Sequence, residues 1–185
     1  TIPPINVHIH RVEMSGDQIK AVQKVTGGLM AGDIGGIGQR SKLGQIAKGF
    51  YNGKAIETAK PEFIRGLVES WPDESAIVWC LYNEEQKSNL RVMPDAANIT
   101  GDTPLAERVK LIDAFKAGER RVLQSKPKIL GFGLNLQVAT RQIFSGLQDS
   151  YESYWQAVKR SNRVGSDRPL NVHIPVTELE VPFIE

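Results

Sequence analysis

Apolar and polar residues alternate at the start of the chain, which is typical of a strand. Residues 5–13, INVHIHRVE, follow this pattern, and it predicts a strand with Val7, Ile9 and Val12 turned toward the core. The pattern therefore places a strand ahead of everything else in the chain.

Helix and loop signals follow this strand. Ser15-Gly16-Asp17-Gln18 has the form of a capping box and predicts a helix start. Six glycines within residues 27–38 predict a flexible loop. A further helix is expected over residues 38–50, ended by Tyr51-Asn52-Gly53.

From Pro61 onward, short apolar runs alternate with helical periodicity. A helix is expected up to Trp71-Pro72, and the continuous apolar run Ala76–Leu81 predicts a strand buried on both faces. A later helix begins at Thr103-Pro104, with a core stripe of Leu105, Val109 and Ile112. The other expected elements are helices over residues 83–92, 134–139 and 151–162, and strands over residues 97–100, 121–124, 142–144 and 171–175.

Strands that alternate with helices predict an α/β fold with a parallel sheet flanked by helices. We expect two parts, a mostly helical extension with a glycine-rich loop over residues 1–59 and a compact α/β domain over residues 60–185.

Composition narrows the class of protein. The 185 residues are 41% hydrophobic and 24% charged, which is typical of a globular chain, and the net charge is +2. No apolar stretch is long enough to span a membrane, and the first residues do not resemble a signal peptide. The lone Cys80 fits a buried core position and a cytoplasmic location. The histidines lack further ligands at metal spacing, so no metal site is expected.

The expected helix near residue 151 carries two distinct faces. One face is an apolar stripe of Tyr151, Tyr154, Trp155 and Val158. The nearly opposite face presents Gln156, Arg160 and Arg163. Two arginines at this spacing repel each other, whereas an anionic ligand such as phosphate would favour the pair. From these residues alone, a solvated basic face and a phosphate site both remain open.

The segment from Gln156 to Gly165 reads Q-A-x-x-R-x-x-R-x-G and resembles the last motif of superfamily 2 helicases, particularly Swi/Snf-type DNA translocases. Other stretches resemble signatures of that family in the same order: residues 39–46, 76–82, 99–108, 115–123 and 131–137. Residues 125–129, Ser-Lys-Pro-Lys-Ile, depart from the usual wording, and the chain is most similar to helicase-type proteins of phages and prophages.

This resemblance implies a RecA-like second motor lobe, with ATP and Mg²⁺ held mainly by a first lobe. In such motors the position of Arg163 is an arginine finger, with Arg160 beside the phosphates and Gln156 orienting them. Gly131 and Gly133 would allow close approach of the backbone to the nucleotide.

The resemblance also implies DNA as a partner. Contacts to DNA phosphates would fall on Lys126, Lys128 and Thr100. A solvated basic loop is the competing interpretation of the two lysines.

The sequence has no phosphate-binding loop of the form G-x-x-x-x-G-K-[ST] and no acidic magnesium motif. The chain therefore resembles the second lobe alone, an enzyme only together with the first lobe of a DNA-dependent ATPase. A helicase-like binding module without hydrolysis is the alternative. A dinucleotide-binding domain is disfavoured, because Leu136 stands where its third glycine is required.

Overall fold

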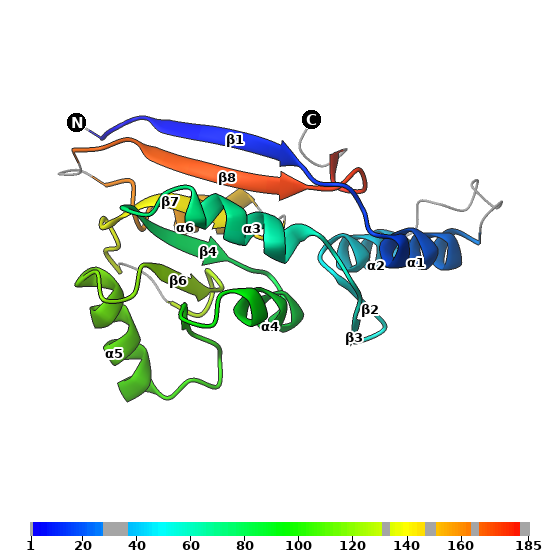
Figure 1. Ribbon diagram of the computed structural model, residues 1–185, viewed down its shortest axis with the longest axis horizontal. Coiled ribbons are helices and arrows are strands. Elements are labelled where there is room, and N and C mark those ends of the chain that lie inside the picture. Colours follow the sequence, from blue (N-terminus) through cyan, green and yellow to red (C-terminus); the bar gives the residue numbers. More distant parts are fainter. Residues whose placement is uncertain (1, 28–36, 131–133, 147–150, 164–166, 182–185) are drawn as a thin grey trace.

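The computed structural model describes residues 2–27, 37–130, 134–146, 151–163 and 167–181. Within them, six parallel strands form one sheet in the order β1-β8-β7-β4-β6-β5 (Figure 1). The strands are β1 (Ile5–Arg11), β4 (Ser75–Trp79), β5 (Ala97–Asn98), β6 (Val122–Ser125), β7 (Ala139–Phe144) and β8 (Leu170–Val176). The predicted parallel α/β fold is confirmed.

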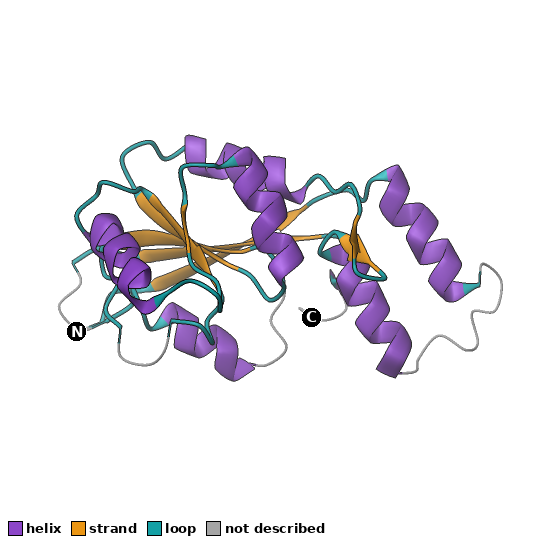
Figure 2. Ribbon diagram, turned by 90° about the horizontal axis from the view of Figure 1, so that it is seen from below, coloured by secondary structure: helices purple, strands orange, loops and turns teal. Residues whose placement is uncertain are grey.

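Helices cover both faces of this sheet (Figure 2). One face carries α3 (Lys60–Glu69) and α4 (Asn83–Val92), and Val78, Val122 and Ile143 pack there against α3. The other face carries α5 (Leu105–Lys116) and α6 (Tyr151–Val158). Alternate strand residues point to opposite faces, so the continuous apolar run in β4 supplies both cores.

A smaller unit stands at the edge of the sheet where the strands end (Figure 1). It consists of α1 (Gly16–Thr26), α2 (Ile37–Ala47) and the hairpin strands β2 (Phe50–Tyr51) and β3 (Lys54–Ala55). The expected capping box at Ser15 is present. Asn52 and Gly53 turn the hairpin with φ of 51° and 75°, since a two-residue hairpin turn of this type requires positive φ at both positions.

The two helices of this unit are antiparallel. Gln18 at the start of α1 donates from Nε2 to the Ile46 carbonyl at the end of α2, at 2.9 Å. Gln39 at the start of α2 donates to the Val25 carbonyl at the end of α1, at 3.2 Å. Hydrogen bonds therefore join the two helices at both ends of the pair.

The predicted facing is wrong for most residues of two apolar stripes, although Ile112 packs partly buried against the core as expected. Val7 and Ile9 are 58% and 44% exposed, because β1 lies at the sheet edge, beyond the helices that cover the other strands. Leu105 and Val109 are 76% and 57% exposed, because α5 turns Phe115 and its neighbours toward the sheet instead. Val12 is buried as expected.

Two predicted helices differ from the structure. Residues 134–136 are extended and not helical, because the backbone N–H of Leu136 donates to the Arg160 carbonyl at 2.7 Å. The helix expected over residues 151–162 ends at Val158. Arg160 and Arg163 therefore follow α6 in a turn and do not share a helical face with Gln156.

A buried ion pair fixes the end of the described chain. Lys60, the first residue of α3, donates from Nζ to Glu180 Oε1 at 2.6 Å, and both side chains are 3% exposed. The backbone N–H of Thr177 donates to the same oxygen at 2.9 Å. This contact joins the segment after β8 to the edge of the sheet that carries the smaller unit.

Candidate functional site

Two arginines lie together just beyond the end of α6. Arg163 donates from Nε to the Lys159 carbonyl at 3.0 Å and from a terminal nitrogen to the Leu134 carbonyl at 3.2 Å. Arg160 is only 4% exposed, and its Nε has no hydrogen-bond partner within the described residues. The backbone thus holds the Arg163 guanidinium in place, and Nε of Arg160 stays unpaired among the described residues.

The electrostatics of this pair favour an anion. Burial lowers the pKa of Arg160 from its ordinary value, and the neighbouring charge of Arg163 lowers it further. No ion pair in the described part of the chain joins either arginine to a carboxylate. Phosphate oxygens are well matched to guanidinium forks, so an incoming phosphate group would relieve this repulsion.

A shallow hollow of about 480 Å³ opens beside Arg163. Five of its six lining residues are polar or basic, and the lining consists of Ile2, Asn135, Gln137, Lys159, Asn162 and Arg163. Asn162 is held by donation from Nδ2 to the Pro3 carbonyl at 2.9 Å. Sequence reasoning missed Lys159, Asn162, Asn135 and Gln137 as neighbours of Arg163, because only the fold brings the loop before β7 to the end of α6.

The other residues predicted for this site are placed differently. Gln156 donates from Nε2 to Glu152 Oε1 at 3.1 Å, one turn back on α6. No contact in the described region joins Gln156 to the arginines. Gly131 and Gly133 lie outside the described residues. The structure therefore brings together Arg160 and Arg163 from the predicted set.

The predicted DNA-contacting residues Thr100 and Lys126 lie at the carboxyl ends of the strands, away from the arginine pair. Each follows a neighbouring strand, β5 and β6, at its carboxyl end. Lys126 donates from Nζ to Oδ1 of Asn83 at 2.6 Å, and Asn83 itself follows β4. Sequence reasoning missed Asn83, although a polar residue at the start of the helix that follows a buried strand is a recognisable signal for this site.

Hydrogen bonds shape the loops around these residues. The Thr100 N–H donates to Thr103 Oγ1 at 3.0 Å, which closes a tight turn after β5. Arg108 donates to the carbonyls of Thr103 and Gly101 at 2.8 and 3.0 Å, so this arginine stabilises the turn. Lys128 is exposed in the loop that follows β6.

A buried network of polar side chains lies beneath the loops at the carboxyl ends of β5 and β6. Gln124 in β6 accepts from Asn89 Nδ2 at 2.9 Å and donates from Nε2 to the Gln86 carbonyl at 3.0 Å and to Asn98 Oδ1 at 2.9 Å. Such a network fixes the strand ends because each buried polar group depends on its partner. Cys80 lies in it, and burial raises the pKa of its thiol well above the ordinary value.

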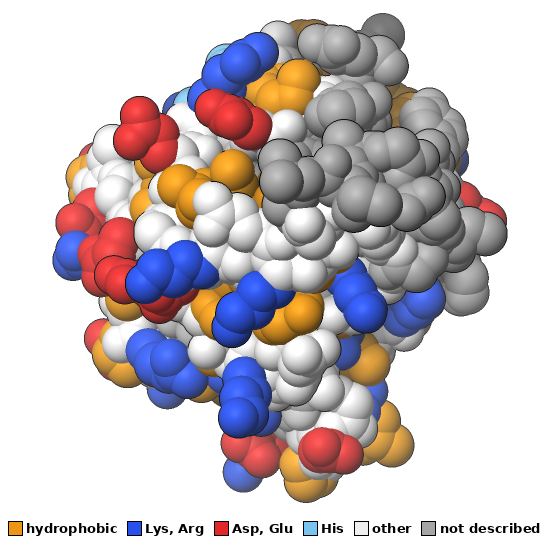
Figure 3. Space-filling model, turned by 90° about the vertical axis from the view of Figure 1, so that its right-hand side faces the viewer, with side chains coloured by type: hydrophobic (Ala, Val, Ile, Leu, Met, Phe, Trp, Pro, Cys, Tyr) orange, Lys and Arg blue, Asp and Glu red, His pale blue; other side chains and the backbone are white. Residues whose placement is uncertain are grey.

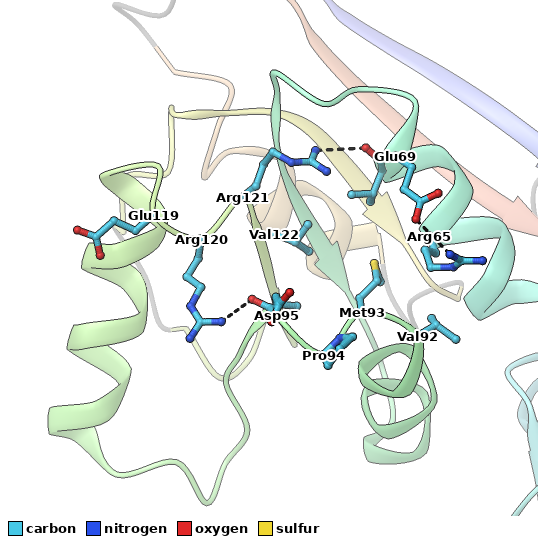
Figure 4. Close-up of a pocket in the computed structure, with 12 residues that line it drawn as sticks. Arg65, Glu69, Val92, Met93, Pro94, Asp95, Glu119, Arg120, Arg121 and Val122 are labelled. Atoms are coloured by element: carbon cyan, nitrogen blue, oxygen red, sulfur yellow. Dashed lines mark hydrogen bonds and ion pairs between the residues drawn. The ribbon is translucent and has the colours of Figure 1, made fainter.

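A further hollow, of about 520 Å³, lies between the end of α3, the end of α4 and the start of β6 (Figure 4). The arginines that line this hollow already form hydrogen bonds or ion pairs with other residues of the chain. Arg121 donates to the carbonyls of Val68, Trp71 and Glu74, and Arg120 donates to the Asp95 carbonyl. Arg65 pairs with Glu69 at 3.1 Å. None of the predicted site residues lines this hollow.

The described residues contain no group of three or more His, Cys, Asp or Glu side chains that could hold a metal ion. Within the same ranges, no helix has the length and apolar character needed to cross a membrane.

The sequence of this chain matches the model of a known protein family. The family model described as "Helicase conserved C-terminal domain" matches residues 59–165. A search of curated proteins found no match.

Solved structures share the fold. The C-terminal part of the Fun30 ATPase domain superposes with a TM-score of 0.72 at 15% identity, over 96% of this chain and 87% of that one. The Sulfolobus solfataricus SWI2/SNF2 ATPase core in complex with dsDNA gives 0.70 at 19% identity, over 95% of this chain and 41% of that one. The C-terminal domain of the same ATPase gives 0.64 at 16% identity, over 94% and 80%.

These likenesses establish a RecA-like fold of the kind found in Swi2/Snf2 C-terminal lobes. The chain spans about two fifths of the archaeal ATPase core. Because the family model matches more than half of its length, the chain belongs to the helicase conserved C-terminal domain family.

Proposed function

We propose that this chain is the second motor lobe of an ATP-dependent DNA helicase or duplex-DNA translocase. The observation that carries the proposal is the pair Arg160 and Arg163, which lie together without a carboxylate partner in the described region, with Nε of Arg160 buried and unpaired there. A buried charge such as that of Arg160, with a like charge beside it, costs stability unless an anion pairs with it.

In this proposal Arg163 acts as an arginine finger. Its contacts to two backbone carbonyls orient the guanidinium before any ligand arrives, so little ordering remains when a phosphate binds. Arg160 adds a second positive charge beside it. ATP with Mg²⁺ supplies the transferred phosphoryl group and is held mainly by a first lobe, because this sequence has no phosphate-binding loop.

DNA is the proposed partner of the opposite edge. Lys126 and Thr100 follow neighbouring strands, exposed Lys128 lies in the loop after Lys126, and all three would donate to DNA phosphates. Similarity to the archaeal core that was solved with dsDNA supports this assignment. Kinship with phage helicase-type proteins and a cytoplasmic location belong to the same proposal.

The experiment uses a polypeptide that carries both lobes and measures DNA-stimulated ATP hydrolysis. We expect Arg163→Ala to lower the rate by about 10³–10⁵-fold, since arginine fingers contribute effects of this size. Arg168→Ala is the matched control, because Arg168 is exposed and only five positions further on. An unchanged rate in a folded Arg163→Ala variant would favour the non-hydrolysing binding module.

A further inference from the structure

The smaller unit is continuous with the proposed DNA edge. Tyr82 follows β4 and lies directly before Asn83, the partner of Lys126. The ring of Tyr82 packs edge-on against Phe50 of the hairpin, with centroids 4.7 Å apart. Lys48 at the end of α2 lies 5.9 Å above the same ring. The unit is thus seated on the carboxyl ends of the strands, next to Lys126.

Basic side chains gather on this end of the molecule. Figure 3 looks onto it and shows Lys and Arg in a band across the surface, with acidic side chains toward its margins. The described part of the unit, within residues 12–58, carries five lysines and three carboxylates. The lysines are Lys20, Lys24, Lys42, Lys48 and Lys54, and the carboxylates are Glu13, Asp17 and Glu57.

The lysines of the two helices are exposed and close in level. Lys20 and Lys24 stand one turn apart on α1, which is about 6 Å along the helix axis. Because Gln18 meets Ile46 and Gln39 meets Val25, Lys42 of α2 lies level with this turn. Like charges at this spacing disfavour a helix, so a stable fold gains nothing from the arrangement itself.

The described part of the chain does not neutralise these charges. Within the described ranges, no ion pair or hydrogen bond joins the side chains of Lys20, Lys24 or Lys42 to another group. Each strand of duplex DNA carries one phosphate per about 3.4 Å of helix axis, so lysines about 6 Å apart on α1 are close enough together to contact phosphates of the same strand.

We propose that α1 and α2 form a second phosphate-binding surface, which extends the track of the duplex from Lys126 onto the smaller unit. The proposal rests on the proposed function, because it takes the same DNA as partner. It assigns to the N-terminal unit a role in gripping the duplex backbone without reading its sequence.

The test is the salt dependence of binding of the full chain to a labelled mixed-sequence duplex. We expect Lys20→Gln with Lys24→Gln to reduce the slope of log K against log[salt] by about 2, since each lost phosphate contact removes about 0.9. The matched control is Arg91→Gln with Lys116→Gln. Both residues are exposed and end α4 and α5 at the other edge of the sheet. The control should keep the wild-type slope.

A third variant, Lys126→Gln, separates this inference from the proposed function. If Lys126→Gln weakens binding while the α1 variant binds like wild type, the second surface is wrong and the DNA edge stands. If the control variant loses as much slope as the α1 variant, overall charge explains the effect and the inference fails. Absence of duplex binding by the wild type at about 50 mM salt would overturn both DNA assignments.

Discussion

Gly146 follows β7 where there is no room for a side chain. A Cβ at this position would lie 2.7 Å from Cγ and Cε of Lys48 and 2.9 Å from Oε2 of Glu85. Glu85 is buried, and its Oε1 accepts from the N–H groups of Leu81 and Tyr82 at 2.9 Å. Gly146 therefore lets the end of β7 approach the base of α2 and the start of α4.

We expect Gly146→Ala to lower the free energy of unfolding by about 1–3 kcal/mol, the usual cost of forcing extra atoms into a packed site. Gly66→Ala is the control. Gly66 lies within α3 with nothing near its Cβ position, so alanine should stabilise by about 0.5–1 kcal/mol. Urea denaturation of both variants checks the difference. Equal stability of Gly146→Ala and wild type would show that Lys48 and Glu85 yield without cost.

At the same scale, the sequence predicted the arginine pair better than its surroundings. The spacing of Arg160 and Arg163 predicted that their side chains lie near each other, and the structure brings the two guanidinium groups within electrostatic reach. The hydrogen bonds of Gln124 with Asn89 and Asn98 could not be predicted, because they join three separate elements. Likewise, no local pattern reveals that Gln156 pairs with Glu152 and not with the arginines.

At the scale of elements, β1 is joined to β8 by a stack of histidines as well as by the strand ladder. His10 and His173 share a hydrogen bond of 2.9 Å between Nε2 and Nδ1, and the His8 ring stacks on His173 at 4.7 Å. Arg141 donates from Nη1 to His173 Nε2 at 3.1 Å. Because Nε2 accepts this hydrogen bond, the proton of neutral His173 lies on Nδ1. Glu74 in turn pairs with Arg141 at 3.2 Å.

This stack should make the fold sensitive to acid. Burial, together with the charges of His8, Arg141 and His10, lowers the pKa of His173 to about 3, against the opposing effect of Glu74. The unfolded chain therefore binds more protons than the native chain between pH ~6.5 and ~3. The free energy of unfolding decreases as the pH is lowered through that window. Burial also lowers the pKa of His10, with the same sign.

We expect the free energy of unfolding to fall by up to about 2 kcal/mol between pH ~7 and ~5, at about 1.4 kcal/mol per unit below the ordinary histidine pKa. His173→Gln should flatten this dependence. Denaturation series at several pH values measure it, and an equally steep dependence in His173→Gln would assign the loss to other groups. The window lies above that in which Glu74 loses its charge, because its pKa is lowered by Arg141 and Thr140.

Element types were predictable where the pattern was long, and their facing was not. The capping box at Ser15 and the apolar run of β4 marked real elements. Leu105 and Val109 fit a helical stripe, yet α5 buries Phe115, because only the sheet decides which side of a helix is covered. The helix expected over residues 134–139 failed because the Arg160 carbonyl competes for the Leu136 N–H.

At the scale of the whole molecule, the two proposed sites lie at opposite ends of the parallel strands. The proposed phosphate site lies at the amino ends and the proposed DNA site at the carboxyl ends. The arginine pair and its hollow lie near the start of β7, and Thr100, Lys126 and the smaller unit lie where the strands end. The alternation of strands and helices predicted a parallel sheet. It could not give the strand order or place β1 beside β8, which pairs residues about 165 positions apart.

The central claim is that this chain completes a motor and cannot hydrolyse ATP without another lobe. The most direct measurement is the rate of ATP hydrolysis by the 185-residue chain alone and joined to a first lobe, each with and without duplex DNA. We expect no turnover by the chain alone and a DNA-stimulated rate in the joined protein. Turnover by the isolated chain that disappears in Arg163→Ala would contradict the claim.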